Sequence, residues 1–224
     1  MIEAVLFDWV DTLVQFTWDD ELLEEAHRVA LAATGSADEP ASFTSRYRRL
    51  VLENATPGDD YRDLLRALGV ADVDRFIDVE HEAWRPAFSV LGAAPALLDA
   101  LRGRGIKTGV VANSWPDTGR VLRADAVAFG LADRLDVLVF SEEVGALKPQ
   151  PEIFLYARDR LGVEPENAIF VGDRLDTDVQ GAARVGMTTV QALWFRAHDT
   201  PSIEPDFLAF TPMDVLNLVG RLAL

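Results

Sequence analysis

The chain has 224 residues, a formal net charge of −16 and no cysteine. This length predicts one large domain, or one domain carrying an insertion, that can bury a sizeable core without a disulfide or metal. The absence of cysteine excludes disulfide scaffolds, zinc ribbons, iron–sulfur sites and thiol nucleophiles. The acidic balance argues against nucleic acid as a partner, because binding to a phosphate backbone depends on lysine and arginine.

The first part of the chain predicts one strand followed by a block of helices. The apolar run from Ile2 to Phe7 is short and ends at an acid, which is typical of a strand buried in a parallel sheet. Apolar residues then recur at helical spacing in four segments, without a convincing strand between them. We expect a helical block at 16–88 with helices at 22–33, 43–50, 61–68 and 73–84.

From residue 89 onward the pattern alternates between helices and strands. Helices are expected at 93–102, 119–129, 153–161, 179–185 and from 213, and strands at 106–111, 137–140, 168–171, 188–193 and 207–210. Such alternation predicts a parallel sheet with helices on both faces. The predicted fold is therefore α/β, a doubly wound, Rossmann-like parallel sheet formed by 1–15 and 89–224, with a helical-bundle domain at 16–88 inserted after the first strand.

The N-terminal segment lacks the features of a targeting sequence. It has no basic region, and Glu3 and Asp8 interrupt its apolar run. No stretch approaches the roughly 18 consecutive apolar residues of a membrane span. We therefore expect a cytoplasmic protein with no membrane partner.

Chemically active side chains follow four of the predicted strands, at the edge where open parallel sheets bind ligands. Clustered carboxylates need a cation among them, and oxygen ligands of this kind favour Mg²⁺. A carboxylate can also attack phosphorus, while a lysine neutralises the phosphoryl group and an asparagine donates to its oxygens. The set therefore predicts phosphoryl transfer. Its members, in chain order, are Asp8, Asn113, Lys148, Asp173 and Asp178.

Four sequence segments carry this pattern. In order and spacing they resemble the motifs of the haloacid dehalogenase-like hydrolase superfamily, over nearly the whole chain. The helical block is similar to the cap of the first subfamily of that superfamily. The segments are FDWVDTL at 7–13, VVANS at 110–114, EVGALKPQPEIF at 143–154 and VGDRLDTDVQGAARVGM at 171–187.

The resemblance implies roles for the acidic residues and the lysine. Asp8 would be the nucleophile that forms an aspartyl intermediate, and Lys148 would be the motif-three lysine. Mg²⁺ would bind Asp8, Asp173 and the main-chain carbonyl of Val10. Asp178 would support the metal site, through water or through Lys148.

The segments also depart from the family pattern. Asn113 follows the phosphate-binding position of motif two, but Ala112 replaces the hydroxyl residue usual there, while Ser114 stands two residues further on. Family phosphatases usually carry an aspartate two residues after the nucleophile as general acid and base, and Val10 can do neither. Asp11 stands where glycine is usual, and we interpret it as a turn residue, a place that aspartate favours. Losing general acid–base help, worth about 10²–10⁴-fold, need not abolish turnover of a good leaving group.

Three functions remain open at this stage. The first is a Mg²⁺-dependent phosphatase that acts on a small phosphorylated metabolite, as a monomer or homodimer. The second is a carbon–halogen hydrolase similar to the 2-haloacid dehalogenases, which also lack the second aspartate but need no metal. The third is a degenerate, non-catalytic member that binds a phosphorylated ligand, a reading that rests on Val10 and Ala112.

Overall fold

The computed structural model describes residues 1–195 and 203–222 of the chain. It divides the chain into two compact units, each formed by segments that are distant in sequence. We call them the α/β unit (Met1–Gln15, Val90–Asn113 and Arg123–Leu224) and the helical unit (Phe16–Ser89 and Ser114–Leu122). Among the described residues, no helix is both long enough and apolar enough to cross a membrane.

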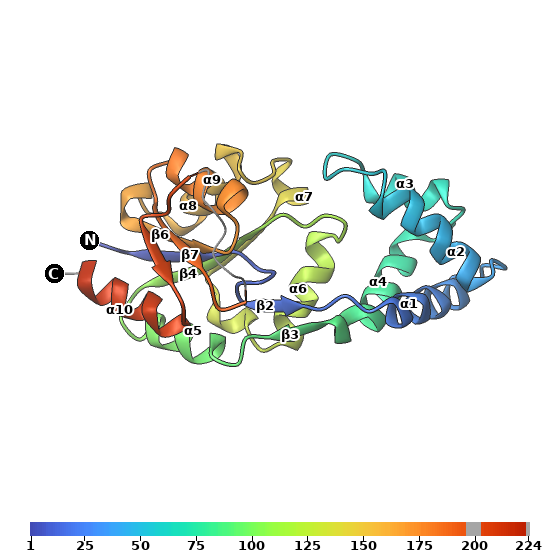
Figure 1. The fold of residues 1–224 in the computed structure, drawn as a ribbon, viewed down its shortest axis with the longest axis horizontal. Helices are drawn as coiled ribbons and strands as arrows, with labels where there is room; N and C mark the ends of the chain where they lie inside the picture. The colour runs from blue at the N-terminus through green and yellow to red at the C-terminus, as the bar shows by residue number, and fades with distance from the viewer. Residues whose placement is uncertain (196–202, 223–224) are drawn as a thin grey trace. The chain divides into compact units, whose positions relative to one another are not determined.

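A six-stranded sheet forms the centre of the α/β unit (Figure 1). Its order is β5-β4-β1-β6-β7-β8, and each neighbouring pair is parallel. This arrangement confirms the predicted doubly wound parallel fold. The strands are β1 (Ala4–Phe7), β4 (Lys107–Ala112), β5 (Val137–Phe140), β6 (Ala168–Gly172), β7 (Thr188–Ala192) and β8 (Phe207–Ala209).

Helices cover both faces of this sheet. In Figure 1, α8 (Pro151–Leu161) and α9 (Gln180–Arg184) lie on one face, and α5 (Ala94–Arg102) and α10 (Pro212–Leu222) on the other. The short α7 (Ser141–Val144) follows β5, and α6 (Gly119–Ala128) begins in the segment that belongs to the helical unit.

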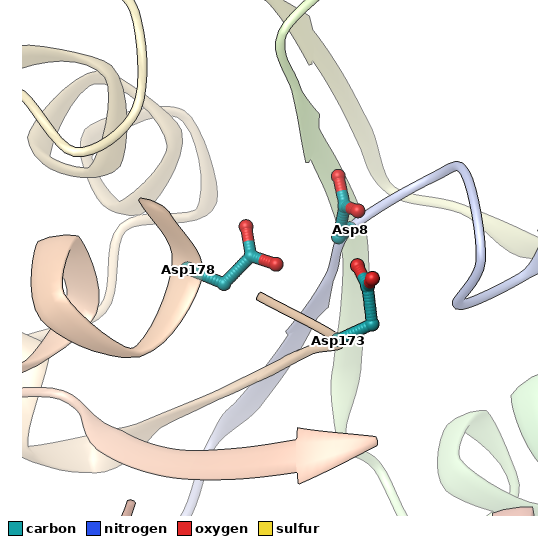
Figure 2. Close-up of side chains that lie close together, drawn as sticks. All are labelled: Asp8, Asp173 and Asp178. Atoms are coloured by element: carbon teal, nitrogen blue, oxygen red, sulfur yellow. The ribbon is translucent and has the colours of Figure 1, made fainter. Parts of the chain in front are cut away.

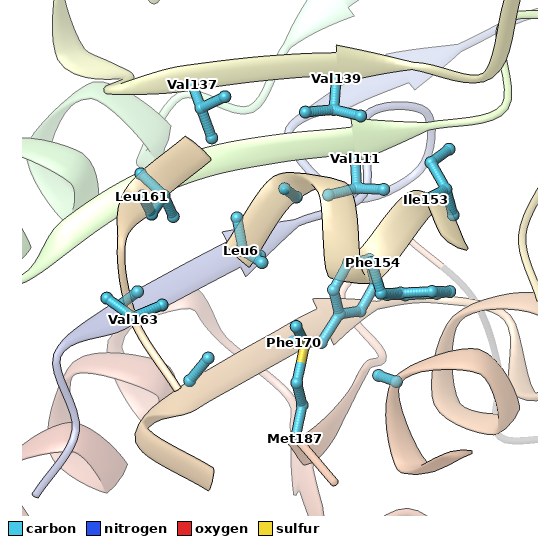
Figure 3. Close-up of a cluster of buried hydrophobic side chains, with 14 of the residues drawn as sticks. Leu6, Val111, Val137, Val139, Ile153, Phe154, Leu161, Val163, Phe170 and Met187 are labelled. Carbon is cyan, nitrogen blue, oxygen red and sulfur yellow. The ribbon is translucent and has the colours of Figure 1, made fainter. Parts of the chain in front are cut away.

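One hydrophobic core of the α/β unit lies between α8 and the sheet (Figure 3). Aliphatic side chains from β1, β4 and β5 meet Phe154 of α8 and Phe170 of β6, whose rings pack edge to face with centroids 5.0 Å apart. Strands buried on both faces explain the continuous apolar runs in the sequence. The core anchors the strands whose carboxyl ends carry the chemical residues.

The helical unit contains the four predicted helices. Aspartate side chains cap three of them by accepting hydrogen bonds from main-chain N–H groups of the first turn, and Glu39 does the same for the fourth. The helices pack around a core that includes Phe43, Tyr47 and Phe76 and also Val121 from the second segment of the unit. They are α1 (Asp20–Ala33), α2 (Pro40–Tyr47), α3 (Tyr61–Ala67) and α4 (Val73–Trp84).

Two short strands were not predicted. β2 (Val14–Phe16) and β3 (Phe88–Val90) pair as a separate two-stranded sheet where the chain passes from one unit to the other. Both strands have three residues, which is too few for a period of two to be recognised in the sequence.

Candidate active site

Three acidic residues meet at the carboxyl ends of β1 and β6. Asp8 directly follows β1, Asp173 directly follows β6, and the two strands are parallel neighbours with Phe7 opposite Val171. Asp178 comes from the turn that leads into α9, and Figure 2 shows the three carboxylates pointing toward one another. One oxygen of each lies within 4.8 Å of the others, and all three residues are buried.

Lys148 lies among these carboxylates. Its Nζ donates to Oδ1 of Asp8 at 2.5 Å and to Oδ1 of Asp178 at 2.6 Å, and its side chain is 3% exposed. The second oxygen of Asp178 accepts a hydrogen bond from the main-chain N–H of Arg174 at 3.0 Å. The structure thus brings together Asp8, Lys148, Asp173 and Asp178, as the sequence predicts.

Burial and charge act in opposite directions on these groups. Burial raises the pKa of Asp178 to about 6, with the neighbouring Asp8 carboxylate adding to the rise and Lys148 opposing it. Burial by itself lowers the pKa of Lys148, but the Asp178 and Asp8 carboxylates outweigh it and leave that pKa above its ordinary value. The ammonium is therefore charged, and a second cation would relieve the remaining repulsion between the carboxylates.

Gly172 makes room for Asp178. A Cβ atom at Gly172 would lie 2.4 Å from Oδ2 of Asp178, far inside van der Waals contact. Only glycine lets the carboxylate pack this closely against the end of β6. The glycine that precedes Asp173 in the sequence thus has a defined steric role.

The segment after Asp8 is a tight turn. The main-chain N–H groups of Leu13 and Val14 both donate to the carbonyl of Trp9, and Asp11 N–H donates to the carbonyl of Val14. Asp11 has a φ of 56°, a left-handed conformation that glycine and aspartate tolerate best. Its interpretation as a turn residue is confirmed, and this backbone explains why glycine is usual there. The role of the Val10 carbonyl as a metal ligand stays a prediction.

Asn113 contacts the main chain of Lys148 rather than a carboxylate. Its Oδ1 accepts from Lys148 N–H at 2.7 Å, and its Nδ2 donates to the Lys148 carbonyl at 3.1 Å. Ala112 is the last residue of β4, and Ser114, which is 3% exposed, belongs to the helical unit. The predicted phosphate contacts of these three residues stay predictions.

Sequence reasoning missed Gln191. This residue is buried in β7 opposite Gly172, and its Nε2 donates to the main-chain carbonyl of Asp173 at 3.3 Å. It therefore helps to hold the turn that presents Asp173. A long polar side chain near the carboxyl end of a predicted strand, at the edge where parallel sheets bind ligands, was the signal that could have pointed to it.

Comparison with known proteins agrees with this arrangement. Residues 2–186 match the family model of the haloacid dehalogenase-like hydrolases. The whole chain is 34% identical to a glyceraldehyde 3-phosphate phosphatase of Methanopyrus kandleri and covers 99% of that protein. A second such phosphatase, from Pyrococcus abyssi, is 30% identical over 88% of this chain and 82% of its own length.

Solved structures show the same fold. The HAD phosphatase of Thermococcus onnurineus superposes with a TM-score of 0.70 at 29% identity, covering 98% of both chains. A 2-haloacid dehalogenase of Pseudomonas syringae superposes with a TM-score of 0.71 at 24% identity, over 99% of this chain and all of that one. With a family model that matches most of the chain and an acidic site at the ends of β1 and β6, this protein is a hydrolase that belongs to the haloacid dehalogenase-like family.

Proposed function

We propose that this chain is a Mg²⁺-dependent phosphatase that hydrolyses a small phosphorylated metabolite through an aspartyl-phosphate on Asp8. The observation that carries the proposal is the buried cluster of Asp8, Asp173 and Asp178 around Lys148. The names of the relatives make glyceraldehyde 3-phosphate the first substrate to test. The site resembles a phosphoryl-transfer site because it supplies a nucleophile and concentrated charge rather than an elaborate acid–base system.

The residues present fit a divalent cation. Three buried carboxylates surround one ammonium, so a charge of 2+ would balance the cluster, and the donors are the hard oxygens that Mg²⁺ prefers. Asp8, Asp173 and the carbonyl of Val10 would hold the ion, with Asp178 supporting the site through Lys148. When bound, Mg²⁺ would neutralise charge on the phosphoryl oxygens.

The chain's own residues perform the two chemical steps. An oxygen of the Asp8 carboxylate attacks phosphorus, and the bond from phosphorus to the leaving oxygen breaks. That oxygen takes its proton from water, because Val10 has no acidic group. Water then attacks the phosphorus of the aspartyl-phosphate, the bond to Asp8 breaks, and inorganic phosphate leaves. Throughout, Lys148 compensates negative charge beside the nucleophile.

A substrate panel with and without Mg²⁺ tests the proposal. We expect phosphate release from short sugar phosphates that depends on Mg²⁺ and is lost in Asp8→Asn, which keeps the size of the side chain but not the nucleophile. No release from any ester, or Asp8→Asn as active as the wild type, would contradict the proposal. Asp11→Asn is the matched control and should stay active. If it abolishes activity while folding and Mg²⁺ binding persist, Asp11 is the general acid.

Two other outcomes point to the alternative functions. Chloride release from a 2-haloacid that is insensitive to a chelator would assign the site to dehalogenation. Tight binding of a phosphate ester with Mg²⁺ but no phosphate release would indicate a ligand-binding protein, the alternative that Val10 and Ala112 support.

The proposal includes a role for the helical unit as a cap that excludes water from the phosphoryl group, which would strengthen the charge interactions there. A crystal structure with Mg²⁺ and fluoroaluminate tests it. Helices that pack at the opposite edge of the sheet from Asp8 would contradict the cap. A cytoplasmic location and a monomeric or homodimeric state also stay part of the proposal.

A further inference from the structure

The contact between Asn113 and Lys148 has the form of strand pairing. Oδ1 of Asn113 accepts from the Lys148 N–H at 2.7 Å, while Nδ2 donates to the carbonyl of the same residue at 3.1 Å. The side-chain amide therefore satisfies both polar groups of the Lys148 main chain, as the peptide groups of a neighbouring strand would. We call this pair of hydrogen bonds the amide clamp.

The clamp joins a rigid element to a loop. Asn113 directly follows β4, which is paired on both sides, with Val110 opposite Phe7 of β1 and Ala112 opposite Phe140 of β5. Lys148 lies between α7 and α8, outside any helix or strand. The sheet thus determines where the main chain of Lys148 lies, rather than the reverse.

The position of the Lys148 main chain matters because the side chain must reach two carboxylates. The ammonium contacts Asp8 at 2.5 Å and Asp178 at 2.6 Å at the same time. Lysine has a long, flexible side chain, and holding it in one conformation costs conformational entropy. A functional group stays within about 0.5 Å of its working position only when neighbouring residues fix the chain that carries it. A loop that is not fixed in this way would let the ammonium lose one of its two carboxylate partners.

The helix behind the loop limits movement from another direction. A Cβ atom at Gly181 of α9 would lie 3.0 Å from Cα of Pro149 and 2.3 Å from the ring of Phe154. The residue after Lys148 is therefore packed directly against the backbone of α9. Together with the clamp, this contact holds the Lys148–Pro149 segment between β4 and α9.

We propose that Asn113 is a positioning residue that acts through Lys148, by clamping its main chain so that the ammonium bridges Asp8 and Asp178. The importance of this for turnover rests on the proposed phosphatase function. The competing role is the direct phosphate contact predicted from the sequence. The variant Asn113→Leu removes both hydrogen bonds and keeps a side chain of similar size. The two roles differ in whether this variant makes Lys148 more mobile.

Lysine labelling tests the clamp without any need for turnover. The sequence contains two lysines, and Lys107 is an exposed internal reference for the buried Lys148. We expect the full-length Asn113→Leu protein to be acetylated at Lys148 about 10-fold faster than the wild type, as local opening becomes easier, with Lys107 unchanged. Peptide mass spectrometry measures both rates. Unchanged labelling of Lys148 would overturn the proposal, whether or not the protein proves to be a phosphatase.

Kinetics with p-nitrophenyl phosphate then separates positioning from substrate contact. We expect Asn113→Leu to lower kcat by about 10- to 100-fold with little change in KM, because a misplaced group costs rate. A raised KM with unchanged kcat would instead assign Asn113 to phosphate binding and overturn the proposal. If wild-type protein releases no phosphate, the proposed function fails while the labelling result still decides the clamp.

Two further variants guard against loss of folding. Asn113→Asp keeps the acceptor for Lys148 N–H but loses the donor to its carbonyl, so labelling should lie between wild type and Asn113→Leu. Asn167→Leu makes the same change at an asparagine that contacts Glu3 at the other end of the sheet, and Lys148 labelling should match the wild type. Equal acceleration of Lys148 labelling in Asn113→Leu and Asn167→Leu would mean general destabilisation and would overturn the proposal.

Discussion

A buried glutamate makes the stability of the helical unit depend on pH. Glu80 of α4 is 5% exposed, and its Oε1 lies 4.0 Å from Nε2 of His27 in α1. Burial raises the pKa of Glu80 to about 8, with the Asp117 carboxylate adding to the rise and His81 opposing it. Burial also lowers the pKa of His27 to about 3, with Arg48 contributing. The two groups are therefore both neutral at pH 7, and their contact is not an ion pair despite the distance.

The two buried tyrosines near Glu80 stay neutral between pH 5 and 9. The hydroxyls of Tyr47 and Tyr61 lie 3.2 Å apart, and burial first, then the Glu80 charge, raises the pKa of Tyr47. Burial likewise raises the pKa of Tyr61, so neither tyrosine hydroxyl loses its proton between pH 5 and 9. Asp117, a charged group from the second segment of the unit, lies 2.9 Å from Nδ1 of His81, with which it forms a hydrogen bond.

The size and sign of the effect follow from linkage. An unfolded glutamate ionises near 4.5, whereas folded Glu80 keeps its proton to about pH 8. Between these values the folded state binds more protons, so stability falls as pH rises. At up to about 1.4 kcal/mol per pH unit, the loss between pH 5 and 8 is on the order of 3 kcal/mol, and it levels off above that.

Urea unfolding at pH 5 to 9 measures this loss in wild type and in Glu80→Gln, which cannot ionise. The difference in the free energy of unfolding, variant minus wild type, should grow by about 3 kcal/mol between pH 5 and 8 and then stay constant. Glu82→Gln changes an exposed glutamate of the same helix and should give a constant difference. Parallel pH curves for wild type and Glu80→Gln would refute the reasoning.

Three further predictions concern the site. Asp173→Asn removes an anionic ligand and should weaken Mg²⁺ binding at least about 10-fold by calorimetry; unchanged affinity would refute the metal assignment. Val10→Asp should raise the turnover of alkyl phosphates more than that of aryl phosphates, by up to about 10²-fold, and equal effects would mean that leaving-group protonation is not limiting. Gly172→Ala should destabilise the protein by about 1–3 kcal/mol and lower kcat because the new methyl displaces Asp178. Gly92→Ala, where the methyl meets open space, is its control in the same unfolding and rate assays.

The sequence by itself determined the main helices, the strands of the large sheet and the candidate catalytic and metal-binding residues. The spacing of apolar residues is a local property, so α4 begins at Val73 and ends at Trp84, and β5 spans Val137–Phe140, as predicted. Asp8 and Asp173 could be assigned to one edge because each follows a buried apolar run, and parallel strands end at the same side of a sheet. The turn role of Asp11 followed from its chemistry alone.

Only the tertiary structure decided which of these residues touch. Strand order places β1 beside β6, and that adjacency brings Asp8 to Asp173, although the two residues are 165 positions apart in the sequence. The amide group of Asn113 can donate to a phosphate or pair with a peptide group, and only the structure shows that it bonds the main-chain N–H and carbonyl of Lys148. Burial turned Glu80 into a neutral group, because the cost of a charge in a core depends on the elements that surround it and not on the residue's own helix.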